Sequence, residues 1–218
     1  PADTVEKCLG NVLAENGKNQ LRLAETYKYA HVTYFFNGHR EEPFENEYRV
    51  LIPSLTITHS DERPELMAPA LTDRLLDAVQ NQAFDFVLLN YANPDTIGHT
   101  GNFQACLEAV RVIDREIGRI LKVVLDTPVI LIITADHGNI EEVVSPVTGH
   151  IETQHDPSPV PFYLVAKEYR NRKFFNAGNL LNETTGILSD VAPTILELME
   201  IKKPPEMTGD SLLKNLLP

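Results

Sequence analysis

Short apolar runs alternate along the chain with stretches in which apolar residues recur every three or four positions. The apolar runs predict strands, whereas the three-to-four recurrence predicts amphipathic helices. The expected strands are residues 21–26, 49–53, 84–91, 129–135 and 160–166, and the expected helices are residues 69–82, 102–125 and 189–199. This alternation predicts an α/β fold of three layers, a largely parallel sheet with helices on both faces.

The longest expected helix, residues 102–125, carries a single apolar face that should be buried. Its other face should be solvated and carries Glu108, Arg111, Asp114, Arg115 and Arg119. The apolar positions are Phe103, Cys106, Val110, Ile113, Ile117, Ile120 and Val124. Cys106 is therefore expected to be a buried thiol. The run at 129–135 is almost continuously apolar, which is typical of a strand covered on both faces.

Other segments give weaker signals. Residues 29–36 are aromatic and β-branched, which favours a strand, but a short helix is also possible; residues 49–53 predict a strand near a sheet edge. Ser189 can cap the last helix, with Val191, Ile195 and Leu198 facing inward. The polar segments 37–46 and 145–158 are expected to be surface or functional loops. No internal boundary stands out, so residues 1–218 are expected to form one domain.

Composition narrows the function. The chain has 218 residues, 43% of them hydrophobic, which is enough for a substantial core. Its net charge is −12 and no basic cluster occurs, so nucleic-acid binding is not expected. A small anionic substrate is still possible, because bound cations can reverse the local field. No signal peptide and no apolar run of about 20 residues stands out, so we expect a cytoplasmic protein that does not bind membranes. Cys8 and Cys106 have neither metal-binding nor redox spacing, which suits a reducing compartment.

Three polar clusters carry the candidate chemistry. They are residues 93–99, 134–139 and 153–155, and the first two directly follow expected strands. Ligands of open α/β sheets gather at the carboxyl ends of the strands. The clusters supply carboxylates and imidazoles, which are ligands for a divalent cation at a catalytic centre.

Spacing within the clusters supports a metal site. Asp95 and His99 are four residues apart, which places both on one side of a turn or helix start. Asp136 and His137 are adjacent, so they can reach one site only at the irregular end of a strand. His155 alone would be an ordinary loop histidine, but with the other two clusters it completes the predicted site.

The sequence resembles the C-terminal part of the phosphatase domain of cofactor-independent phosphoglycerate mutases, members of the alkaline phosphatase-like superfamily. The resemblance runs from about residue 9 to residue 213. It is carried by residues 23–33, 35–38, 89–95, 98–101, 134–139, 159–162 and 204–209. The stretch 134–139 is shared across the superfamily, whereas the segment around Lys28 and the run 90–95 are specific to the mutases.

The resemblance implies a two-metal site, usually with manganese and sometimes with magnesium. Asp95, His99 and His155 would hold the first ion. Asp136 and His137 would hold the second, together with an aspartate and a serine from the family's N-terminal segment. Lys28 would contact the substrate phosphate or the nucleophile. The family's reaction interconverts 2- and 3-phosphoglycerate in glycolysis through a phosphoserine.

The chain departs from the family pattern in three ways that bear on activity. The first strand with its metal-binding aspartate, the serine nucleophile and the inserted phosphotransferase domain have no counterpart in the 218 residues. We therefore expect the isolated chain to be inactive, and the N-terminal segment acting in trans is a possible partner. Glu152 replaces a usual histidine and Asp156 a usual hydroxyl residue, which could alter metal binding at His155.

Two other functions stay open at this point. The chain could be a phosphatase or phosphopentomutase relative of the same superfamily, although the Lys28 segment and residues 205–209 argue against it. It could also be a non-catalytic metal-binding remnant. Restoring mutase turnover by supplying the family's remaining segments would distinguish the first function from both alternatives.

Overall fold

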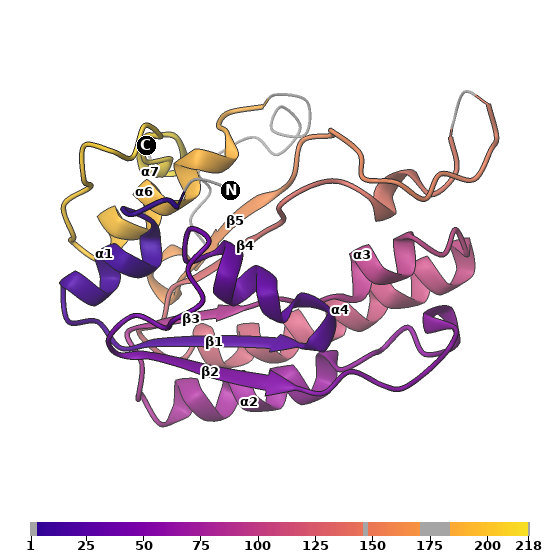
Figure 1. Ribbon diagram of the computed structural model, residues 1–218, viewed down its shortest axis with the longest axis horizontal. Helices are drawn as coiled ribbons and strands as arrows, with labels where there is room; N and C mark the ends of the chain where they lie inside the picture. The colour runs from indigo at the N-terminus through magenta and orange to yellow at the C-terminus, as the bar shows by residue number, and fades with distance from the viewer. Residues whose placement is uncertain (1–3, 146–147, 171–183, 218) are drawn as a thin grey trace.

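The computed structural model of the chain describes residues 4–145, 148–170 and 184–217. Its strands are β1 (Gln20–Glu25), β2 (Glu47–Ile52), β3 (Phe86–Leu89), β4 (Leu131–Thr134) and β5 (Phe162–Val165). Its helices are α1 (Leu9–Glu15), α2 (Ala68–Gln80), α3 (Asn93–Gly98), α4 (Phe103–Val124), α6 (Val191–Leu198) and α7 (Leu213–Leu216). The order of strands and helices confirms the predicted α/β fold (Figure 1).

The strands form two sheets. β2, β1 and β3 pair in parallel with β1 in the centre, while β4 and β5 pair antiparallel. All six residues of β1 are buried, as expected of a central strand with helices on both sides. The expectation that residues 49–53 lie at a sheet edge is confirmed by β2.

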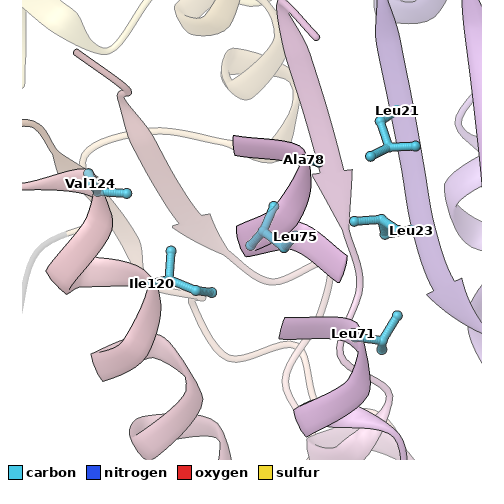
Figure 2. Packing of buried hydrophobic residues seen from close by; sticks show 7 residues of the cluster. All are labelled: Leu21, Leu23, Leu71, Leu75, Ala78, Ile120 and Val124. Carbon is cyan, nitrogen blue, oxygen red and sulfur yellow. The ribbon is translucent and has the colours of Figure 1, made fainter. Parts of the chain in front are cut away.

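One face of β1 packs on α2 and α4. Leu21 and Leu23 contact the cluster of Leu71, Leu75 and Ala78 from α2 and Ile120 and Val124 from α4, as Figure 2 shows. Burying each large aliphatic side chain contributes about 1.5–3 kcal/mol. This cluster therefore fixes both helices against the sheet.

α1 and α6 cover the other side of the parallel sheet, where their buried cluster also contacts Phe86 of β3. Leu13 of α1 and Leu196 of α6 are fully buried in one cluster. Arg22, on this face of β1, is also fully buried, with its guanidinium carbon 4.4 Å from the centre of the Phe36 ring. Its Nη2 donates to Gln20 Oε1 at 2.6 Å. Helices thus cover both faces of the parallel sheet, as predicted.

The predicted inward face of the long helix is only partly right. Cys106 is buried, which confirms the expectation for its thiol, but Phe103 is 51% and Val110 47% exposed. Glu116, which is polar, is only 2% exposed, and Arg119 Nη1 donates to its Oε2 at 2.7 Å. The apolar arc of α4 is wider than the surface that its neighbours cover, so periodicity could not tell which part of the arc is buried.

Two further expectations need correction. The strand alternative for residues 29–36 is wrong, because His31–Phe35 form a π-helical turn. β4 is half-buried and its Thr134 exposed, so the expectation of a strand covered on both faces is wrong for the part of the chain that the structure describes.

No helix within the described ranges has the length and apolarity to cross a bilayer.

The last helix begins at Val191, so Ser189 is not its N-cap. Ser189 lies in the preceding 3-10 turn, and Asp190 occupies the N-cap position. The Asp190 carboxylate accepts hydrogen bonds from the backbone amides of Ile187 and Asp210 instead of capping the helix. The side chains buried most deeply on α6 are Pro193, Thr194 and Leu196, while the expected Val191, Ile195 and Leu198 are half-buried.

Candidate metal centre

Two buried side chains fix the position of α3 next to the candidate metal centre. It directly follows β3, and the buried Asn93 at its start donates from Nδ2 to the carbonyl of Pro64 at 2.6 Å. Ile97 is fully buried against α4, in a cluster with Ala105, Cys106 and Ala109. The helix therefore presents Asp95 and His99 on one side, with Asp95 Oδ1 3.1 Å from His99 Nε2. This agrees with the helix start expected from their spacing.

The segment after β4 is joined to the loop before β5. Gly138 and Asp156 exchange two backbone hydrogen bonds, Gly138 N to Asp156 O at 3.1 Å and Asp156 N to Gly138 O at 2.8 Å. This bridge carries His155 to the site, where its Nε2 lies 3.0 Å from Asp95 Oδ1. The ring of His137 stacks on that of His155, with centroids 3.6 Å apart.

Lys28 lies in the 3-10 turn directly after β1 and is 7% exposed. Its Nζ donates to Asp95 Oδ2 at 2.5 Å. Burial raises the pKa of Asp95, but hydrogen bonds from Lys28 and Asn139 outweigh it and lower the pKa to about 2. Asp95 is therefore an anion at neutral pH, with one oxygen on the ammonium and the other facing the histidines.

Asn139 belongs to the site, although the sequence assigned it no role. It is buried, and its Nδ2 donates to Asp95 Oδ1 at 2.9 Å. A Cβ at Gly98 would lie 2.4 Å from Asn139 Oδ1, so glycine at 98 makes room for this amide. The signal was available, because Asn139 ends the 134–139 cluster. Asparagine is common in turns, however, and its amide carries no charge that marks it as functional.

Two histidines are oriented by backbone carbonyls. His99 Nδ1 lies 2.6 Å from the carbonyl of Thr153, and His137 Nδ1 lies 3.2 Å from that of Gly138. A carbonyl can only accept, so each Nδ1 donates to it and each Nε2 faces the other side chains of the site. Metal-binding histidines in proteins are held in this way.

The structure brings all five expected metal ligands and Lys28 into one region. Candidate ligand atoms of Asp95, His137 and His155 lie within 4.8 Å of one another. Asp136 is more peripheral, with its side chain 60% exposed and its Oδ2 3.6 Å from His137 Nε2. Imidazoles with a carboxylate suit a borderline divalent cation. The role of each residue as a ligand, and of Lys28 as a substrate contact, stays a prediction.

The carboxylates near His155 have partners of their own. Asp156 Oδ1 accepts the amide of Ser158 at 2.6 Å. A hydrogen bond to Asp156, followed in importance by burial, raises the pKa of Glu142. Glu152 is exposed.

A hollow of about 420 Å³ lies at the opposite end of β4 and is lined by Thr127, Val129 and Lys167, among others. It contains none of the expected site residues.

Comparisons with known proteins identify the family of the chain. The profile of the Metalloenzyme superfamily matches residues 1–203. A 2,3-bisphosphoglycerate-independent phosphoglycerate mutase from Clostridioides difficile is 48% identical over 205 residues, which are 94% of this chain and 39% of that protein. A mutase of the same description from Pseudomonas putida is 48% identical over 210 residues, 96% of this chain and 39% of that protein.

A solved structure shows the same fold. The phosphoglycerate mutase of Leishmania mexicana, crystallised at low cobalt concentration, superimposes with a TM-score of 0.79 and 26% identity over 93% of this chain and 38% of that one. The chain thus spans about two fifths of the length of the relatives it matches. It belongs to the metalloenzyme superfamily, and along nearly its whole length it is similar to 2,3-bisphosphoglycerate-independent phosphoglycerate mutases.

Proposed function

We propose that the chain is the metal-binding portion of a phosphoglycerate mutase that interconverts 2- and 3-phosphoglycerate in the cytoplasm. The observation that carries this proposal is the position of Lys28, whose ammonium lies against a carboxylate of the candidate metal centre. A lysine beside a cation site is suited to a phosphate, because a phosphate binds the ammonium and the cation together. The high identity with the mutases supports the same substrate class.

In the complete enzyme, we propose that Asp95, His99 and His155 hold one divalent cation. Asp136 and His137 help to hold a second, with the aspartate and serine that the family resemblance implies for the unmatched part of the relatives. Manganese is the expected ion and magnesium is possible. Bound cations would lower the pKa of the serine hydroxyl and neutralise charge on the transferring phosphoryl group.

The residues of this chain position that chemistry. Lys28 would bind a substrate phosphate oxygen, and Asn139 holds Asp95 in place through its amide. The carbonyls at Thr153 and Gly138 fix the tautomers of His99 and His137. Because the serine of the phosphoserine route is expected in the unmatched part of the relatives, we propose that the chain alone has no mutase activity.

Complementation tests this function. The purified chain is mixed or co-expressed with a second polypeptide covering the remaining three fifths of a relative, in a host lacking its own mutase. Turnover of 3-phosphoglycerate should appear only with both parts and should be lost when the serine of the second part is replaced by alanine. Turnover by the chain alone would contradict the proposal. Hydrolysis of phosphoesters by the combined parts, without mutase turnover, would favour a phosphatase relative.

A further inference from the structure

A histidine outside the expected site residues shares one side of a helical segment with Lys28. His31 follows Lys28 by three residues, and the backbone stays helical from the 3-10 turn Thr26–Lys28 into the π-helical turn His31–Phe35. Side chains three residues apart in such a segment lie one above the other. Because the Lys28 ammonium binds Asp95, His31 is placed to face the same site.

The charges that act on His31 support this position. Burial lowers the pKa of its imidazole and Lys28 lowers it further, whereas Asp136 and Asp95 raise it in part. Interactions between charges weaken with distance, so the ring lies near the ammonium and near carboxylates that follow both β3 and β4. The imidazole is neutral at neutral pH and has one N–H to donate.

The π-helical turn holds His31 in place without using its ring nitrogens. Val32 and Thr33 are buried, and Thr33 Oγ1 donates to the carbonyl of Tyr29 at 2.7 Å, which anchors the turn. His31 itself is exposed, and its ring meets the edge of the Phe35 ring with centroids 5.5 Å apart. The imidazole makes no hydrogen bond to any other described residue. Its nitrogens are therefore available to a ligand in the site.

We propose that His31 is a further substrate-binding residue, which donates a hydrogen bond to a phosphoryl oxygen bound beside Lys28. This inference rests on the proposed function, because that function supplies a phosphate ester as the substrate. A phosphoryl group has three strong acceptor oxygens, so an ammonium, an imidazole N–H and a cation can each bind a different one. His31 thereby orients the phosphoryl group, whereas Lys28 and the cations neutralise its charge.

Direct binding of 3-phosphoglycerate tests this inference. The full chain, with isotope-labelled histidine rings, is titrated by NMR in magnesium, since manganese is paramagnetic. We expect the ring signals of His31 to shift saturably with 3-phosphoglycerate and to stay unchanged with glycerate, which lacks the phosphate. His31→Phe keeps a ring against Phe35 and removes the donor, so it should raise the dissociation constant about 10-fold or more. His31→Gln supplies a donor again and should recover most of the affinity.

His59→Phe is the matched control, since His59 is an exposed histidine of another loop, and it should leave the dissociation constant unchanged. If circular dichroism shows that His31→Phe has unfolded, His31→Ala replaces it, and the ring signals of the unmodified chain still decide. Three results would each overturn the inference: no binding of 3-phosphoglycerate, saturation without a shift of the His31 signals, or a folded His31→Phe variant with unchanged affinity. Complementation does not enter this experiment. If complementation fails while binding depends on His31, only the proposed function is rejected.

Discussion

The Nζ of Lys28 lies 2.5 Å from Oδ2 of Asp95, although the two residues are 67 positions apart in the chain. The pair joins the end of β1 to the first turn of α3, next to the parallel strand β3. One carboxylate therefore links the ammonium to the candidate metal ligands. A substitution of Lys28 should therefore affect both the contact made by the ammonium and the candidate metal ligands.

Replacing Lys28 with methionine keeps the aliphatic stem and removes the ammonium. In the complemented enzyme, we expect turnover to fall by about 10²–10³-fold, the size of effect seen when a charge-stabilising donor is lost. The stability of the chain should change by only about 1–2 kcal/mol, because Asn139 still binds Asp95. Lys7→Met, at an exposed surface pair with Glu15, is the control and should leave turnover unchanged. Equal turnover of the two variants would contradict the role of Lys28.

Lowering the pH should reduce the free energy of unfolding of the metal-free chain, because Asp95 becomes protonated. Its pKa in the folded state is about 2, below the ordinary value of 3.8, because Lys28 and Asn139 outweigh the effect of burial. The stability that the ionised carboxylate contributes is therefore complete above about pH 4 and is lost as the pH falls through about 2. Urea unfolding in EDTA should show the difference between the chain and Asp95→Asn shrinking over this range. A difference that does not depend on pH would disprove the assignment.

The space at Gly98 should control metal affinity through Asn139. A Cβ there would meet Asn139 Oδ1 at 2.4 Å, so Gly98→Ala should push the amide off Asp95. We expect cobalt to bind about 10-fold or more weakly, since Asn139 orients a ligand. Gly118→Ala is the matched control on α4, where nothing lies within 4 Å of the added methyl group. It should leave the affinity unchanged and stabilise the helix by about 0.5–1 kcal/mol.

The buried Glu116 should matter more for stability than its place on a charged helix suggests. It binds Arg119, which also donates to Asp73 of α2 and so links the two helices. Glu116→Ala should cost about 1–3 kcal/mol in urea unfolding, because Arg119 loses a partner in a half-buried site. Glu108→Ala, at an exposed pair with Arg111, should cost no more than about 0.5 kcal/mol. Similar costs for both would show that burial of Glu116 contributes little.

The site was more predictable than the burial of its supporting helix. The end of β3 could be located because its apolar run is followed by the polar cluster 93–99, and ligands gather at the carboxyl ends of parallel strands. Asp95 and His99 also report their own geometry, since residues four apart on a helix lie on the same side. Local pattern was therefore enough to bring these residues together.

Contacts between distant segments were not predictable in the same way. That Asn139 reaches Asp95 depends on how the segment after β4 meets α3. The buried part of α4 depends on which neighbours are present, so Val110, on the apolar arc, is exposed while the polar Glu116 is buried. Periodicity measures the width of an apolar arc, but it cannot name the surface that covers it.

The exposed apolar side chains of α4 affect the solubility of the chain. Phe103, Leu107 and Val110 are all exposed. They are spaced four and three residues apart, so they form one exposed apolar strip along the first half of α4. Surfaces of this kind limit solubility, because copies meet through them at high concentration. In a cell they are also what chaperones and proteases recognise on incompletely assembled proteins.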